Sequence, residues 1–431
     1  MVSWFLLVGA VLVVMAFAGR WVARMPLSFA LVYLAVGFAI GPDGVNLVAI
    51  DLVAHGGIIE ILAEVAVLIS LFAVGLRLNL PLAWKFWRTP IKLATSTMLL
   101  TIAGIALAAH ALLGFDWPVA VLLGAVLAPT DPVLASDVQV RHADDRDALR
   151  LALTAEGGLN DGTAFPAVIL GLMLIGAAPD FSRWVWHDVV WAIAGAVALG
   201  TACGLLLAWA VARIRRSSGG LEFEEFLALG MIALTYGAAL ATETYGFIAV
   251  FVAGLAFAQA KFHGPRPRLS AAAAPGSAQR LLVFTTQCER LAEVALVLLI
   301  GAALWTVSWS PQIIAFGAAL MFIVRPLATL ITIRTSELSR LRRRLLAWFG
   351  IRGIGSVYYA TYAMENADYA PWMHEFASAT LVAIAMSIAA HGASATPLMN
   401  WMRARRSAPE SRADVGRDEN RDPKRKKAAR A

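Results

Sequence analysis

Long apolar segments alternate with short polar ones along the whole chain. The apolar segments are roughly 16 to 30 residues long, and an α-helix needs about 20 apolar residues to cross the hydrocarbon core of a bilayer. This pattern predicts an all-α polytopic membrane protein with about thirteen transmembrane helices. The helices are expected at about residues 3–19, 26–41, 58–78, 91–114, 117–138, 147–177, 184–212, 223–242, 246–260, 283–307, 312–333, 345–364 and 374–401.

Composition supports the membrane class and excludes several others. Hydrophobic residues make up 59% of the chain and charged residues 15%, whereas soluble domains carry about 25% charged residues. The only cysteines, Cys203 and Cys288, do not suggest a disulfide framework. The sequence contains no Walker-type phosphate loop and no dinucleotide-binding fingerprint. We therefore expect no cofactor, no ATP-driven cycle and no enzymatic activity.

The basic residues alternate between the two sides of the predicted membrane. With the N-terminus outside and thirteen spans, 33 of the 36 Lys and Arg residues fall in cytoplasmic stretches. This asymmetry is the positive-inside pattern of multi-pass proteins. It predicts a protein of the plasma membrane (in bacteria, the inner membrane) with a cytoplasmic C-terminus. Because the charge follows this topology, the net charge of +7 does not indicate a nucleic-acid partner.

The predicted membrane domain covers residues 1–402. Within it, residues 261–282 are rich in Pro and Ala and are expected to form a cytoplasmic linker between two halves. Residues 403–431 are basic and lack apolar periodicity, so we expect a disordered cytoplasmic tail. The first apolar segment has no leading positive charge and is followed by Arg20 and Arg24, which favours a retained helix over a signal peptide.

Two of the predicted helices contain residues that break a helix. The fifth carries Pro129-Thr130-Asp131-Pro132 and the twelfth carries Gly350-Ile351-Arg352-Gly353. They stand seven segments apart, as expected if segments 1–6 and 8–13 are inverted repeats, in which broken helices at corresponding positions form the binding site. Asp131 and Arg352 would neutralise the partial charges of the half-helix ends.

Asp161, in the sixth segment, is the first candidate for chemistry. An ionisable residue inside a bilayer is expensive, which makes it a functional candidate by default. Glycines and Pro166 suggest that this segment is also interrupted, so we expect the carboxylate to face a water-filled cavity. Carboxylate, amide and hydroxyl oxygens suit a proton or a small hard cation. The residues themselves therefore predict Asp161 and Thr130 as ligands of the metal cation.

Other membrane-embedded charges are expected to form structural ion pairs. Glu156 lies five residues before Asp161 and is therefore offset by about 140° around a helix. Pairing Glu156 with Arg325 would solve the desolvation problem of both groups. Arg352 needs a counter-ion as well, and we expect Glu64 or Glu293 to provide it.

At these residues the chain resembles the NhaP/NHE branch of the monovalent cation–proton antiporters. The family's motifs resemble five short stretches in order: Thr130-Asp131-Pro132, Glu156 to Asn160-Asp161, Glu293 to Gly301, Arg325, and Gly350-Ile351-Arg352-Gly353. The predicted spans and their order resemble the family's over about residues 1–400. One position departs from the family: Gly157 stands where a serine, able to help coordinate the ion, often follows the glutamate.

The resemblance implies an antiporter domain with a dimerisation part and a mobile core part, two crossing broken helices, alternating access and a homodimer. It also implies that Asp161 binds the cation or the proton with help from Thr130 and Asn160, while Glu156 and Arg325 are structural. A single titrating carboxylate predicts electroneutral 1:1 exchange of Na⁺ for H⁺, with K⁺ or Li⁺ as alternative cations.

Several alternatives remain open at this point. A K⁺-selective cation/proton antiporter is the nearest one. A cation channel or an ion-sensing membrane scaffold would lack proton coupling. An intramembrane hydrolase would need the carboxylates of Asp131 and Asp161 to share a water, and an organic-anion transporter would need Arg352 to face its substrate.

Overall fold

The computed structural model describes residues 9–10, 13–14, 17, 27–78, 83–135, 138–140, 145, 147–176, 179–218, 224–262, 269–270, 277–335, 338–368 and 370–407. The chain forms two compact units. The larger comprises residues 29–391 and contains every candidate site residue. The smaller comprises residues 1–28 and 392–431, and within it the Ser28 N–H donates to the Gly392 carbonyl at 2.8 Å.

The described structure is helical apart from one short antiparallel strand pair, β1 (Lys261–Phe262) with β2 (Leu269–Ser270). The helices are α2 (Phe29–Ile40), α3 (Gly56–Arg77), α4–η1–α5 (Trp84–Lys92, Leu93–Thr97, Met98–Leu113), α6 (Trp117–Leu127), α7 (Ala148–Ile175), α8–η2–α9 (Phe181–Arg183, Trp184–Trp191, Ala192–Ser218), α10 (Glu224–Ala241), α11 (Gly246–Gln259), α12 (Ser277–Ala303), η4 (Leu304–Thr306), α13–η5–α14 (Pro311–Ala319, Leu320–Val324, Arg325–Thr332), α15 (Arg340–Trp348), α16 (Ile354–Glu365) and α17 (Trp372–Ser407).

The all-α polytopic prediction is confirmed. Helices occupy each predicted span from the second to the thirteenth, and the few described residues of the first span are helical. Among the described residues, six helical segments are long and apolar enough to cross a membrane, and four shorter apolar helices accompany them. Apolar side chains on α9, such as Leu206 and Trp209, are more than half exposed, as expected for a surface that contacts lipid.

Some helices extend beyond the predicted apolar limits. The fourth span begins at Trp84 rather than near residue 91, and α12 begins at Ser277, inside the predicted linker 261–282. Basic and polar residues interrupt the apolar pattern at both places. The helices still continue beyond the hydrocarbon, because long basic side chains can extend to water from a helix end. Residues 263–268 and 271–276 of the linker lie outside the described residues, as do 408–431 of the predicted tail.

The fifth and twelfth segments are broken where the sequence predicts it. Helix α6 ends at Leu127, before Pro129, and α15 and α16 are separated by residues 349–353. The fourth and eleventh segments both contain a π-helical stretch, Leu93–Thr97 and Leu320–Val324. Two pairs of related irregularities, each seven segments apart, support the predicted repeat.

The prediction of an interrupted sixth segment is wrong. Helix α7 runs without a break from Ala148 to Ile175. Its glycines allow close packing instead: a Cβ at Gly158 would overlap the ring of Phe251, and one at Gly162 would overlap Ile248. Both neighbours belong to α11. The small residues therefore fit α11 onto α7 and do not unwind it.

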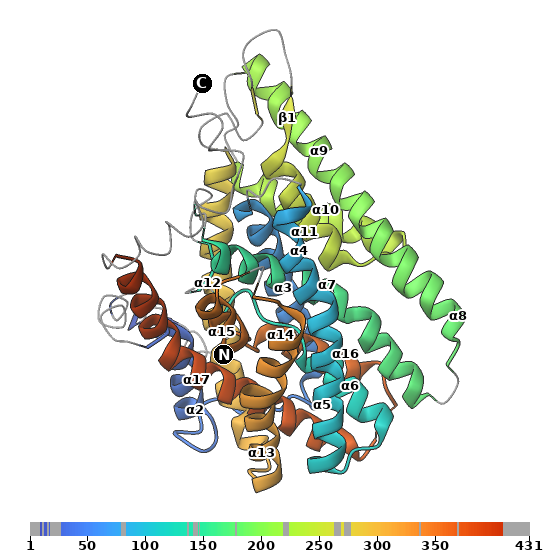
Figure 1. Cartoon of the computed structure of the whole chain (residues 1–431), viewed down its shortest axis with the longest axis vertical. Coiled ribbons are helices and arrows are strands. Elements are labelled where there is room, and N and C mark those ends of the chain that lie inside the picture. Colours follow the sequence, from blue (N-terminus) through green and yellow to red (C-terminus); the bar gives the residue numbers. More distant parts are fainter. Residues whose placement is uncertain are drawn as a thin grey trace, which may run out of the picture. The chain divides into compact units, whose positions relative to one another are not determined.

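The packing of the larger unit places the broken helices against the continuous ones. Helix α11 packs against α3 and α9, and α6 contacts both α5 and α7 (Figure 1). Helix α16 packs against α3, α6 and α7. Most of α16 is buried, from Ile354 to Ala360 without interruption. The break of the twelfth segment therefore lies inside protein, which is the condition for irregular backbone at membrane depth.

Candidate functional site

The two helix breaks contact each other directly. The Asp131 N–H donates to the Ile351 carbonyl at 2.8 Å. In return, Asp131 Oδ2 accepts a hydrogen bond from the Ile354 N–H, the first residue of α16. Its Oδ1 accepts from the Val133 N–H at 2.7 Å and the Leu134 N–H at 3.3 Å. Asp131 thus places negative charge at the N-terminal end of α16, where the helix dipole favours it.

Arg352 places positive charge at the C-terminal end of α6, next to the break in the fifth segment. Its Nε donates to the carbonyl of Leu127, the last residue of α6, and its Nη1 donates to the Gly350 carbonyl at 2.5 Å. The side chain is 1% exposed. A guanidinium at the C-terminal end of a helix stabilises the unpaired carbonyls there. Each break therefore supplies the charge that compensates the other one.

Gly353 allows the breaks to approach this closely. A Cβ at that position would overlap Leu134 and lie 2.5 Å from Asp131 Oδ2. A larger residue would separate Asp131 from the N-terminus of α16. The small residue predicted as a helix breaker is also required by the crossing itself.

Asp161 lies on α7 beside the same crossing. Its Oδ1 would lie 3.1 Å from a Cβ at Gly355, in the first turn of α16. The side chain is 0% exposed, and neither carboxylate oxygen has a hydrogen-bond partner among the described residues. The Tyr359 hydroxyl donates to the main-chain carbonyl of Asp161 and leaves the carboxylate unbonded. The expectation that this carboxylate faces a water-filled cavity is therefore wrong for this conformation, in which protein occludes it.

Residues next to Asp161 and next to Gly355 carry buried neutral polar groups. Asn160 Nδ2 donates to Thr130 Oγ1 at 2.8 Å, which joins α7 to the break after α6. Asn160 Oδ1 is buried and has no partner among the described residues, and the same holds for Ser356 Oγ in the first turn of α16. The structure thus brings Asp161, Asn160 and Thr130 together at the crossing. One carboxylate among amide and hydroxyl oxygens is a suitable ligand set for a proton or a small monovalent cation.

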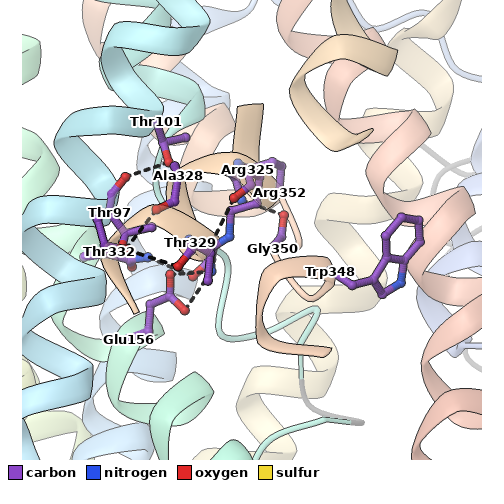
Figure 2. Close-up of polar contacts among 12 residues, drawn as sticks. Thr97, Thr101, Glu156, Arg325, Ala328, Thr329, Thr332, Trp348, Gly350 and Arg352 are labelled. Carbon is purple, nitrogen blue, oxygen red and sulfur yellow. Dashed lines mark hydrogen bonds and ion pairs between the residues drawn. The ribbon is translucent and has the colours of Figure 1, made fainter. Parts of the chain in front are cut away.

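Glu156 of α7 and Arg325 of α14 lie in direct contact. Arg325 Nη2 lies 2.7 Å from Glu156 Oε1 and 2.9 Å from Oε2 (Figure 2). The side chains are 3% and 1% exposed. Removing one partner of a pair this deeply buried strongly destabilises the folded protein, because the other charge is then left buried without a counter-ion.

The structure does not place Glu64 or Glu293 against Arg352, so that expectation is corrected. Glu64 accepts a hydrogen bond from the Tyr236 hydroxyl, and Glu293 lies near Tyr33. Within the described part of the chain Arg352 has no ion pair within 4 Å. Carbonyls accept hydrogen bonds from its Nε and Nη1, its Nη2 has no hydrogen-bond partner there, and Glu156 is an acid within electrostatic range. The partial negative charge of these carbonyls compensates part of the charge of the guanidinium.

Sequence reasoning missed a second buried ion pair. Arg77, at the end of α3, pairs with Glu289 of α12, and Ser70 donates to Glu289 Oε1 at 2.8 Å. The sequence analysis singles out neither residue: Arg77 falls at the end of the span predicted for residues 58–78, and Glu289 falls inside the span predicted for residues 283–307. The one available signal was that Arg77 directly follows an unbroken apolar run. The sequence also did not predict Ser356 and Tyr359 as residues of the site, because no sequence pattern distinguishes their hydroxyl groups from others near a glycine-rich helix break.

These features define a class of helical membrane protein with two crossed, broken helices and a buried carboxylate beside them. A family model described as "Sodium/hydrogen exchanger, transmembrane" matches residues 9–401. The chain belongs to this family.

Individual relatives agree with this assignment. The chain is 23% identical over 412 residues to the K(+)/H(+) antiporter NhaP of Alkalimonas amylolytica, covering 92% of this chain and 66% of that protein. It is 29% identical over 211 residues to Na(+)/H(+) antiporter 2 of Zygosaccharomyces rouxii, covering 46% of this chain and 25% of that protein. The chain thus spans less than two thirds of these relatives' lengths.

Solved structures support the fold. The sodium proton antiporter MjNhaP1 from Methanocaldococcus jannaschii at pH 8 aligns with a TM-score of 0.69 and 21% identity, over 90% of this chain and 96% of that one. An electron-microscopy structure of the same antiporter aligns with a TM-score of 0.69 and 20% identity, over 90% and 95% of the two chains.

Proposed function

We propose that this protein exchanges a monovalent cation for H⁺ across a membrane by alternating access. The observation that carries the proposal is the Asp161 carboxylate, which is completely buried, has no hydrogen-bond partner among the described residues and lies against the first turn of α16. A charged carboxylate without a partner is costly in this setting. Binding either a proton or a cation removes the cost, so the two ligands compete for one position.

Competition at one carboxylate couples the two ions. When Asp161 holds a proton the site is neutral, and when a cation replaces that proton the site is neutral again. The loaded site can therefore cross the low-dielectric interior in either form, whereas the empty, charged site cannot. Exchange is then electroneutral, with one proton leaving for each cation bound. Thr130 and Asn160 complete the cation's oxygen shell.

The rest of the machinery holds the site together. Asp131 and Arg352 keep the two breaks joined, and Glu156 with Arg325 fixes α7 to α14. Because Asp161 is occluded, a moving core part has to open it to each side in turn, against a dimerisation part that stays fixed. We place the protein as a homodimer in the plasma membrane, with its N-terminus outside and its C-terminus in the cytoplasm, in line with the positive-inside pattern.

Na⁺ is the cation we propose first, with Li⁺ as an alternative. A second candidate is K⁺, favoured by the relative named as a K(+)/H(+) antiporter, which aligns with 92% of this chain. Neutral ligands around one carboxylate suit either ion, so the choice rests on the spacing of the oxygens.

The direct test uses purified protein in proteoliposomes that contain a pH-sensitive dye. An outward-directed proton gradient is set up, and Na⁺, K⁺ or Li⁺ is added separately, with and without a clamp on membrane potential. We expect at least one cation to dissipate the gradient at a rate that the clamp does not change. In vesicles that contain the Asp161→Asn variant, the gradient should dissipate no faster than in vesicles without protein. Exchange by Asp161→Asn at the wild-type rate would remove Asp161 from the mechanism, and failure of every cation in the wild type would contradict the antiport proposal.

A further inference from the structure

Gln139 lies in the stretch between the break after α6 and the start of α7, and it is 0% exposed. Its main chain is held in place on both sides. The Gln139 N–H donates to the Ala135 carbonyl at 3.2 Å, and the Val140 N–H donates to the Thr154 hydroxyl of α7 at 2.9 Å. These bonds fix Gln139 against one face of α7.

Among the described residues, neither the oxygen nor the nitrogen of the Gln139 side-chain amide has a hydrogen-bond partner. A buried polar group without a hydrogen-bond partner is destabilising, and such an amide in a folded protein requires an explanation. Asn160 Oδ1 and both carboxylate oxygens of Asp161 share this condition.

Gly157 shows where the amide points. A Cβ at position 157 would lie 3.4 Å from Gln139 Nε2 and 3.2 Å from the Cβ of Pro132. The end of the Gln139 side chain therefore stands over the backbone of α7 at Gly157. Residues 157 and 161 are four apart and share one helix face, separated by about 6 Å along the axis. An oxygen at the level of Gly157 and the carboxylate of Asp161 therefore lie on the same face of α7.

We propose that Gln139 supplies an oxygen ligand to the monovalent cation bound at Asp161, and that it sets the affinity for this ion. The inference rests on the proposed function and names a further residue of the same site. A 180° rotation of the amide exchanges oxygen and nitrogen positions, so Oε1 can face Gly157. Because an amide is neutral, this ligand strengthens cation binding and leaves the one-proton stoichiometry at Asp161 unchanged.

The test compares cation titrations of the full chain in proteoliposomes. For Gln139→Leu, which keeps the bulk and removes the oxygen, the half-saturating concentration of the transported cation should rise about tenfold, the equivalent of 1.4 kcal/mol. The maximal rate should stay close to the wild type. Gln139→Asn keeps the amide and withdraws it by one methylene, so it should give a smaller rise in the same direction, and it serves where Gln139→Leu does not fold.

Thr380→Val is the matched control. Thr380 is 0% exposed on α17, and its hydroxyl also lacks a partner among the described residues, so the variant reports the general effect of removing such a group. Its half-saturating concentration should match the wild type. If Thr380→Val raised the half-saturating concentration as much as Gln139→Leu does, the effect would reflect packing, and the assignment of Gln139 as an ion ligand would be overturned.

The two proposals fail in distinguishable ways. If the wild type exchanges a cation and Asp161→Asn does not, but both Gln139 variants stay within twofold of the wild-type half-saturating concentration, only the role of Gln139 is overturned. If the wild type exchanges no cation, both proposals fall together.

Discussion

Asp131 and Asp161 are two buried carboxylates at one helix crossing, and they differ in almost every contact. Asp131 is 3% exposed and accepts hydrogen bonds from three main-chain N–H groups, among them the first residue of α16. Asp161 is 0% exposed and accepts none at its carboxylate within the described structure. The two groups are close enough to interact electrostatically.

The difference separates a structural acid from a functional one. The fixed N–H groups around Asp131 stabilise its charged form and tie its carboxylate to the two helix breaks. The Asp161 carboxylate accepts no such hydrogen bonds within the described structure. A bound cation or proton therefore compensates its charge. A buried acid is therefore a candidate for ion exchange when its partners are missing, and burial alone does not identify it.

Neutralising Asp161 should have the largest effect on transport and the smallest on folding. Asp161→Asn removes the titrating group but breaks no hydrogen bond to its carboxylate. We expect exchange to fall to the background of empty vesicles while the thermal midpoint of unfolding stays at or above that of the wild type. A clear drop in the midpoint, with transport lost, would mean that the carboxylate holds the fold together as Asp131 does.

Breaking the ion pair behind the site should have the largest effect on stability. Removing one partner of a buried pair typically costs about 3–5 kcal/mol, so Arg325→Ala and Glu156→Gln should each lower the unfolding free energy by about that much. Unfolding in mixed detergent micelles measures this. The double substitution Glu156→Leu with Arg325→Met should be less destabilised than Arg325→Ala, and strictly additive losses would argue that the two side chains do not depend on each other.

Asp131→Asn should have a moderate effect on stability. The amide keeps one acceptor oxygen but loses the negative charge at the N-terminus of α16, and it places an N–H₂ group against main-chain donors. An unsatisfied buried donor costs about 1–3 kcal/mol. Folded protein should still exchange ions, with the half-saturating cation concentration little changed. Complete loss of exchange in well-folded Asp131→Asn would contradict the division of roles between the two acids.

Glu64→Gln should have the smallest effect. Glu64 is only half-buried and accepts one hydrogen bond from Tyr236, which the amide oxygen of glutamine can still accept. Substitutions away from buried charge networks usually stay within about 0.5 kcal/mol. Exchange rates in the same vesicle assay should equal those of the wild type, and a large drop would assign Glu64 to the ion path.

The sequence predicted the features that depend on local chemistry. Apolar length located the spans, and the paired prolines around Thr130-Asp131 located a break that the structure contains. The pairing of Glu156 with Arg325 followed from the few charged groups available at that depth, whereas the association of Asn160 with Thr130 was implied by the family resemblance.

The features that were missed depend on distant neighbours. Whether Gly158 unwinds α7 or packs it is decided by Phe251 on another helix. Arg77 and Glu289 are 212 positions apart, and nothing local marks them as partners. The Nε and Nη1 groups of Arg352 donate to main-chain carbonyls, which every residue type has and which therefore leave no pattern in the sequence.

The central claim is that one cation displaces one proton from Asp161, and proton release on cation binding tests it most directly. Purified protein in weakly buffered detergent solution is titrated with the transported cation, and released protons are counted with a pH dye while bound cation is measured by calorimetry. We predict one proton released per cation bound in the wild type and none in Asp161→Asn. Cation binding without proton release, or equal release from Asp161→Asn, would contradict the account.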